Sequence, residues 1–96
     1  MGKNMTIYNA AKTGNSEAVG QLIQSGVNIE DHDNASNNTP LMVASENGHA
    51  EIVRILLDKG AKIEVKDETG RNALMIAALQ GHAEIVRILL ENKANI

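Results

Sequence analysis

Apolar residues in the middle of the chain recur with the spacing of an amphipathic helix. Between residues 50 and 58 they lie at i, i+1, i+4 and i+5, and they are Ile52, Val53, Leu56 and Leu57. This spacing places them on one broad stripe of a helix. Arg54 lies three residues after Glu51 and four before Asp58, so ion pairs within the helix are expected. The pattern predicts a helix over residues 50–58 with one buried side.

A shorter helix is predicted directly before this one. Thr39 can cap a helix, and Pro40 suits its first position. Gly48 can adopt the left-handed conformation that ends a helix. Residues 63–66 alternate like a short extended arm, and residues 67–70 have turn composition. One unit is therefore predicted to contain a helix, a tight turn, a second helix and a long loop.

This unit occurs three times along the chain. Residues 48–57 recur letter for letter as residues 81–90. A less similar copy of the unit precedes these two. The spacing from this copy to the second is one residue longer than the spacing from the second to the third. The repeats predict a single domain over residues 1–96, with an N-terminal cap-like unit, an internal unit and a terminal uncapped unit at residues 5–33, 34–67 and 68–96.

The loop between the first two units is one residue longer than the next loop. The extra residue lies in the polar stretch between Asp33 and Leu41, where an insertion costs little. We expect Asn37 to take the place of Gly70, because Asn tolerates a positive φ angle.

The length of the repeat, about 33 residues with two helices and a turn, resembles the ankyrin repeat. Residues 39–44 read Thr-Pro-Leu-Met-Val-Ala beside the family pattern T-P-L-H-x-A, and residues 48–53 read Gly-His-Ala-Glu-Ile-Val. The resemblance implies an all-α solenoid of stacked helix-turn-helix units with short hairpin loops. It also implies a role in binding other proteins. Met42 and Met75 replace the family's His, which links neighbouring loops, so we expect weaker polar linking between units.

The two ends of the predicted stack differ in polarity. Ala18 and Gln21 stand where the later units carry Ile, so these positions should face backwards, where the first unit has no neighbour. Val86 and Leu90 repeat apolar positions that should face forwards. As i and i+4 neighbours they form one patch. We expect weak end-to-end self-association through this patch.

Composition excludes several classes of function. Nine Lys and Arg against twelve Asp and Glu give a net charge of −3, which argues against nucleic-acid binding and a polybasic membrane patch. The absence of Cys excludes zinc fingers and thiol nucleophiles and suits a reducing compartment, so a cytoplasmic location is expected. The longest apolar run, residues 74–79, is far too short to span a membrane.

Few residues suggest chemistry. His49 and His82 each lie two residues before a Glu, but both are interpreted as structural, with hydrogen bonds to nearby backbone. The acidic cluster at residues 30–33, Glu30 to Asp33, could hold a divalent cation weakly, although the ligand pattern of a calcium loop is missing. No phosphate-binding loop or nucleophile elbow occurs. We therefore predict no enzyme activity, no cofactor and no metal site.

The remaining prediction is a protein-binding surface. Stacked units present their loop tips and first helices as one concave face, and the residues there vary between units while the frame repeats. The predicted partner-binding residues are Asn34, Ser36, Asn38, Glu46, Asn47, Glu68, Thr69, Arg71, Leu79 and Gln80. Arg71 and Leu79 are the expected anchors. Two alternatives stay open: a spacer fragment or engineered scaffold without a ligand of its own, and the weak cation site at residues 30–33.

Overall fold

A computed structural model describes residues 5–31, 36–92 and 94. The helices in this part of the chain are α1 (Ile7–Thr13), α2 (Ser16–Gln24), α3 (Pro40–Glu46), α4 (Ala50–Asp58), α5 (Ala73–Leu79) and α6 (Ala83–Glu91). Consecutive helices form antiparallel pairs, one pair per repeat. The predicted all-α architecture of stacked helix-turn-helix units is confirmed.

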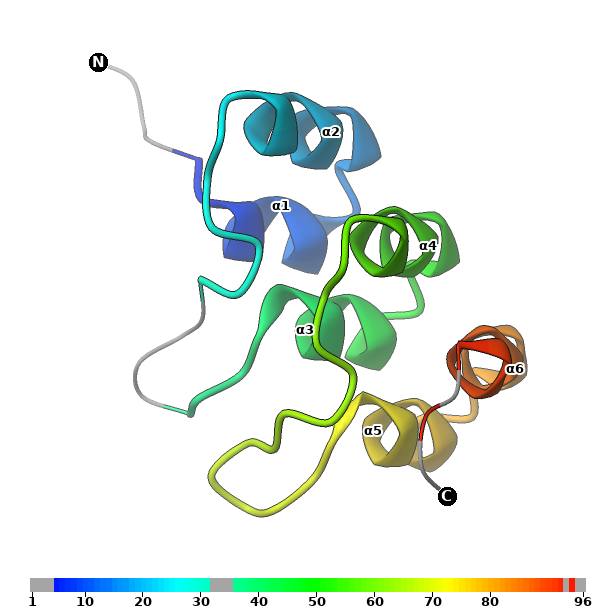
Figure 1. The fold of residues 1–96 in the computed structure, drawn as a ribbon. Helices are drawn as coiled ribbons and strands as arrows, with labels where there is room; N and C mark the ends of the chain where they lie inside the picture. The colour runs from blue at the N-terminus through cyan, green and yellow to red at the C-terminus, as the bar shows by residue number, and fades with distance from the viewer. Residues whose placement is uncertain (1–4, 32–35, 93, 95–96) are drawn as a thin grey trace.

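The helices lie in two layers (Figure 1). The first helices of the units, α1, α3 and α5, form one layer, and α2, α4 and α6 form the other. α3 contacts both α1 and α5, and α4 contacts both α2 and α6. The long loops project from one side of the stack. Each unit therefore rests only on its neighbours, as expected for a repeat protein.

The first helices begin where the sequence supplies a cap. The side chains of Thr6, Thr39 and Asn72 each accept a hydrogen bond from the backbone N–H three residues later, at 3.0, 3.2 and 2.9 Å. Pro40 occupies the first turn of α3. Asn72 thus performs in the third unit the capping that Thr39 performs in the second.

Left-handed residues end the first helices and shape the loops. Gly48 and Gly81 have φ angles of 78° and 77°, as predicted. Asn37 has a φ of 60° where Gly70 has 84°, which confirms that Asn37 takes the glycine position. Residues 32–35, which include part of the longer loop, lie outside the described residues.

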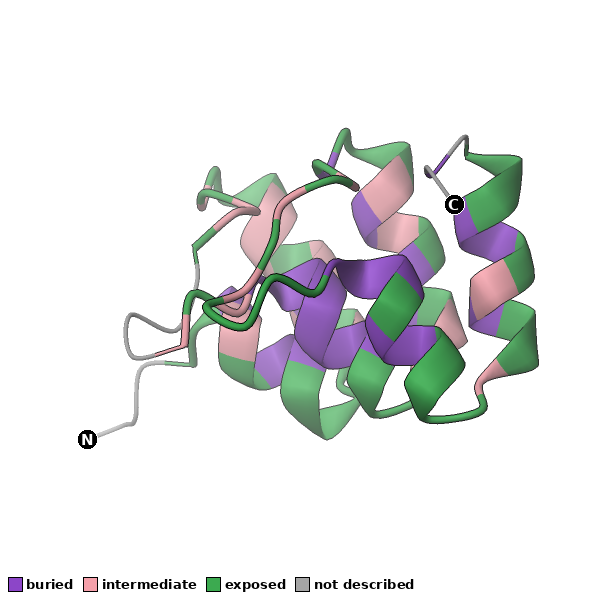
Figure 2. Ribbon diagram, turned by 90° about the horizontal axis from the view of Figure 1, so that it is seen from below, coloured by how far each residue is buried: buried purple, intermediate pink, exposed green. Residues whose placement is uncertain are grey.

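The core runs without interruption through all three units (Figure 2). Leu56 and Leu89, at the same position of α4 and α6, are both fully buried. α3 is buried along most of its length, from Pro40 to Ser45, because units stack on both of its sides. α5, in contrast, leaves Met75 exposed.

Candidate partner-binding surface

The loop between the second and third units is organised by Asp67. Its Oδ1 atom accepts hydrogen bonds from the Thr69 backbone N–H at 2.9 Å, the Thr69 hydroxyl at 2.7 Å and the Arg71 backbone N–H at 2.9 Å. Its Oδ2 atom lies 3.3 Å from Nη2 of Arg71. This carboxylate closes the predicted turn and fixes the tip of the loop.

The same contacts set the charge state of Asp67. Burial alone would raise the pKa of this carboxyl group. The hydrogen bonds from Arg71 and Thr69, together with the Arg71 charge, outweigh burial and lower the pKa below its ordinary value. Each of these contacts favours the ionised form.

Hydrogen bonds between neighbouring loops join them into one surface. The Glu68 backbone N–H donates to the Ser36 carbonyl at 3.0 Å, and Nδ2 of Asn37 donates to the Lys66 carbonyl at 3.0 Å. The Glu30 carboxylate accepts from the Lys62 backbone N–H at 2.9 Å. Glu30, proposed above as part of a cation site, therefore links two units.

The structure gives that cation site no further support. Of its other candidate ligands, Asp31 is exposed, and His32 and Asp33 lie outside the described residues. Among the residues that are described, no group of three or more acidic or His side chains is placed to hold a metal ion.

The two equivalent histidines connect each second helix to the unit before it. Nε2 of His49 lies 3.1 Å from the Lys12 carbonyl, and Nε2 of His82 lies 3.0 Å from the Glu46 carbonyl. Because a carbonyl oxygen only accepts, Nε2 is the protonated nitrogen in both. The structural interpretation is confirmed. These rings supply polar links between units although Met42 and Met75 stand where the family has His.

Arg54 also bonds between units. Its Nη2 atom lies 3.3 Å from Oε2 of Glu84 on α6. The ion pairs expected with Glu51 and Asp58 within α4 do not form, because the side chain reaches across to the next helix instead. Both partners are more than half exposed, so the pair adds little stability.

The loop-tip residues predicted to bind a partner divide into two groups. Glu68, Thr69 and Arg71 are exposed, although the last two are held by Asp67. Ser36 and Asn38 are half-buried. Nδ2 of Asn38 lies 3.5 Å from the Tyr8 hydroxyl and its Oδ1 is buried without a hydrogen bond, so this side chain points into the stack. Asn34 lies outside the described residues.

The predicted residues at the ends of the first helices are all exposed. Glu46 and Asn47 end α3, and Leu79 and Gln80 end α5. Leu79 is 66% exposed, more than any other large apolar side chain in the described part of the chain. We call the exposed loop tip at residues 68–71 and these helix ends, together with Lys12, the hairpin face.

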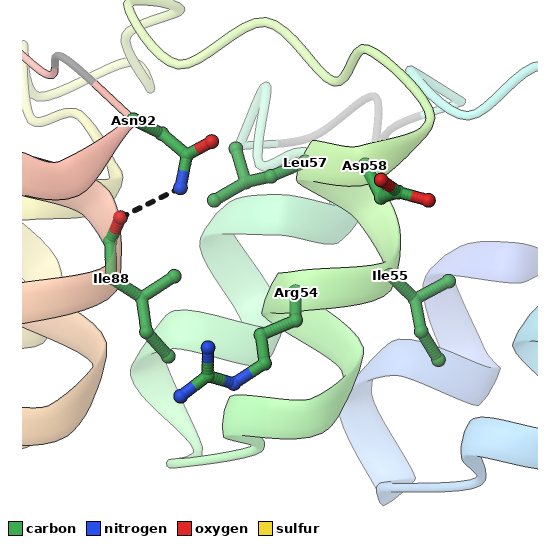
Figure 3. Close-up of a pocket in the computed structure, with 6 residues that line it drawn as sticks. All are labelled: Arg54, Ile55, Leu57, Asp58, Ile88 and Asn92. Atoms are coloured by element: carbon green, nitrogen blue, oxygen red, sulfur yellow. Dashed lines mark hydrogen bonds between the residues drawn. The ribbon is translucent and has the colours of Figure 1, made fainter.

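A separate groove of about 410 Å³ lies between α4 and α6 (Figure 3). Its lining includes Arg54, Leu57, Asp58, Ile88 and Asn92. Ile88 of α6 points towards α4, and Ile55 of α4 points away from α6. Ile55 and Ile88 occupy the repeat position of Gln21. That position was predicted to face the preceding unit, and this view agrees. The lining lacks a nucleophile beside a base, so the groove offers no catalytic arrangement.

The predicted self-association patch lies on the last unit. Val86 is half-buried, and Leu90 is 41% exposed. Met75 is 45% exposed and Ala78 is also exposed. These two residues were not predicted as part of the patch, although they occupy the repeat positions of Met42 and Ser45 in α3. We call the side formed by Met75, Ala78, Val86 and Leu90 the forward face. Self-association through it remains a prediction.

The geometry defines a repeat protein built from helix pairs stacked through a shared core. A family model described as ankyrin repeats, in three copies, matches residues 7–96. The chain therefore belongs to the ankyrin-repeat family, whose members are generally protein-interaction modules. Within the described residues, no helix has the length and apolar character needed to cross a membrane.

Curated relatives share this region with the chain. It is 38% identical over 64 residues to glycerophosphocholine phosphodiesterase GDE1 of Eremothecium gossypii, covering 67% of this chain and 5% of that protein. It is 44% identical over 59 residues to mouse ankyrin repeat, SAM and basic leucine zipper domain-containing protein 1, covering 62% and 12%. It is 43% identical over 61 residues to human ankyrin repeat and KH domain-containing protein 1, covering 64% and 2%. The chain thus spans a small part of each of these relatives.

Proposed function

We propose that the chain is a non-catalytic interaction module that binds a partner protein through its hairpin face. The observation that carries this proposal is the contrast between frame and surface. Frame positions repeat between units and are buried, whereas hairpin-face positions are exposed and differ. The equivalent residues Lys12, Glu46 and Leu79 present a cation, an anion and an apolar group in successive units. Such a row can distinguish one partner from another.

Leu79 is the proposed apolar anchor of this face. A large exposed apolar side chain beside polar neighbours is typical of the centre of an interface. Arg71 has a different role from Leu79, because its ion pair with Asp67 holds the Arg71 side chain against its own loop. We propose that this ordering prepares the loop tip for binding and reduces the entropy lost on association.

The chemistry of the face supports binding rather than catalysis. Its polar groups include Thr69, which donates to Asp67, and Asn47, whose Nδ2 donates to the Val43 carbonyl at 2.9 Å. The Asp67 carboxylate beside Thr69 is a weak base, because its pKa is lowered and the same oxygen accepts from two backbone N–H groups. Although one relative is named as a phosphodiesterase, the chain matches only 5% of that protein, so we do not extend that activity to this chain.

Affinity capture from lysate of the source organism tests the proposal. The immobilised chain is compared with Leu79→Glu and with Leu90→Gln, a matched change of an exposed Leu outside the hairpin face. We expect the wild-type chain and Leu90→Gln to retain the same protein and Leu79→Glu to retain it at least about tenfold less well. Equal capture by all three chains, or no captured protein, would favour a spacer without a ligand.

A further inference from the structure

The turn between α3 and α4 contains the single Asn-Gly pair of the chain, Asn47-Gly48. Both residues are exposed. At the equivalent turns, Thr13 and Gln80 precede the glycine in the first and third units. Only the second unit therefore places the short amide side chain of Asn directly before its turn glycine.

The backbone N–H of Gly48 is unpaired, unlike that of the equivalent glycines. The Gly14 N–H donates to the Ala10 carbonyl, and the Gly81 N–H donates to the Ala78 carbonyl at 3.1 Å. The Gly48 N–H donates to no backbone carbonyl among the described residues. Because glycine has no Cβ atom, its own residue leaves this nitrogen open to the side chain before it.

Two contacts keep the Asn47 amide away from this nitrogen. Nδ2 of Asn47 donates to the Val43 carbonyl at 2.9 Å, and the ψ angle of Asn47 is 5°. At this angle the Cα–Cβ bond points away from the Gly48 nitrogen, so the two groups meet only after rotation about the Cα–C bond. The His82 ring opposes that rotation, since a methyl group built on Gly48 would lie 3.0 Å from its Cε1 atom. A reaction between the two groups therefore requires the end of α3 to open locally.

We propose that Asn47-Gly48 is a modification site, at which the chain converts the Asn47 amide into a carboxylate. The Gly48 nitrogen loses its proton to a base from solvent and attacks Cγ of Asn47. The new C–N bond closes a cyclic imide, the Cγ–Nδ2 bond breaks, and Nδ2 leaves as ammonia. Water then adds to one of the two imide carbonyls and breaks its C–N bond. Opening on one side restores the main chain with aspartate, and opening on the other side gives isoaspartate, in which the chain runs through the side chain.

The product changes the join between the second and third units. A carboxylate cannot donate to the Val43 carbonyl as Nδ2 of Asn47 does. Its charge lies at the C-terminal end of α3, where the helix dipole disfavours an anion. It also follows Glu46, whose carbonyl oxygen lies 3.0 Å from Nε2 of His82. The conversion therefore adds negative charge to the hairpin face and weakens the helix end that His82 contacts. The reaction itself does not depend on whether that face binds a partner.

Ageing of the full-length chain at mildly alkaline pH tests the proposal. Peptide mass spectrometry locates each converted amide, and enzymatic methylation that is selective for isoaspartate identifies the product of ring opening. We expect isoaspartate to accumulate at residue 47 sooner than at any other Asn of the chain. Aspartate without isoaspartate would indicate direct hydrolysis and overturn the proposal. An Asn47 that stays intact, or that converts after other Asn residues, would also overturn it.

Two variants test the roles of the residues involved, with circular dichroism to verify folding. Asn47→Gln is the matched control, because it copies Gln80 of the third unit and retains an amide; conversion there as fast as in the wild-type chain would exclude the cyclic imide. His82→Ala should react about fivefold faster, the factor expected when one hydrogen bond no longer resists opening. An unchanged rate in the folded variant would contradict the role assigned to the ring. If His82→Ala does not fold, the isoaspartate measurement on the wild-type chain still decides the proposal.

Discussion

At the scale of single residues, the glycines at the ends of the first helices show how units are joined. Gly48 and Gly81 have almost the same left-handed φ angle, so an Ala at either position carries the same backbone cost, about 1–2 kcal/mol. They differ in surroundings, because only Gly48 lies under a His ring, that of His82.

Gly48→Ala should therefore destabilise the chain more than Gly81→Ala. The added methyl group would displace the His82 ring and weaken its hydrogen bond to the Glu46 carbonyl. We expect a difference of about 1 kcal/mol in the free energy of unfolding, measured by denaturant melts of the two variants. Equal losses would show that the ring contact contributes nothing to stacking.

A second prediction at the scale of single residues concerns Asp67. Its pKa is lower in the folded chain than its ordinary value of 3.8, so the ionised carboxyl stabilises the fold. This contribution is fully present above the ordinary pKa and is lost as the pH falls through the folded pKa.

Asp67→Asn tests this dependence, since it removes the charge and preserves the size. Its free energy of unfolding should fall by about 1–2 kcal/mol near neutral pH, and the gap to the wild-type chain should narrow below about pH 4. Urea melts from pH 7 to pH 2 measure the gap. A gap that stays constant over this range would mean that the Asp67 charge has no part in holding the loop.

At the scale of elements, burial alone does not decide which of the second helices loses more stability when its central Leu is truncated. Leu56 of α4 and Leu89 of α6 are both fully buried, and each change to Ala should cost about 2–5 kcal/mol. α4 lies between α2 and α6, whereas α6 contacts α4 on one side and ends the described stack. The surroundings of Leu89 can therefore relax more easily.

We expect Leu56→Ala to cost more than Leu89→Ala, because a cavity that cannot collapse destabilises the fold more. Paired denaturant melts, with exposed Met75→Ala as a reference, would measure both losses. The reverse order would contradict the view that the central unit is the most constrained.

Local sequence signals predicted the elements well. Ala50–Asp58 is the helix that the apolar stripe indicated, and Asn37 has the positive φ expected from its place in the repeat. These features depend on a few neighbouring residues. The partners of His82, Arg54 and Glu30 depend instead on how far one unit is displaced against the next, and spacing along one helix gives no measure of that displacement.

At the scale of the whole molecule, the stack has two unlike ends. The N-terminal end carries the more polar Ala18 and Gln21, and the C-terminal end leaves Leu90 exposed. Exposed apolar surface tends to associate. We predict weak, concentration-dependent self-association that Leu90→Gln reduces, measured by sedimentation at high concentration. A strictly monomeric chain with its last helix as protected from hydrogen exchange as α4 would contradict this prediction.

The proposed function requires that the partner contacts the hairpin face rather than the opposite layer of helices. Hydrogen exchange of the chain, alone and bound to the partner that it captures, measures which side is covered. We expect slower exchange at residues 67–71 and at the C-terminal ends of α3 and α5, with α2 and α4 unchanged. Protection confined to α2, α4 and α6 would contradict it and place the partner on the opposite layer of helices.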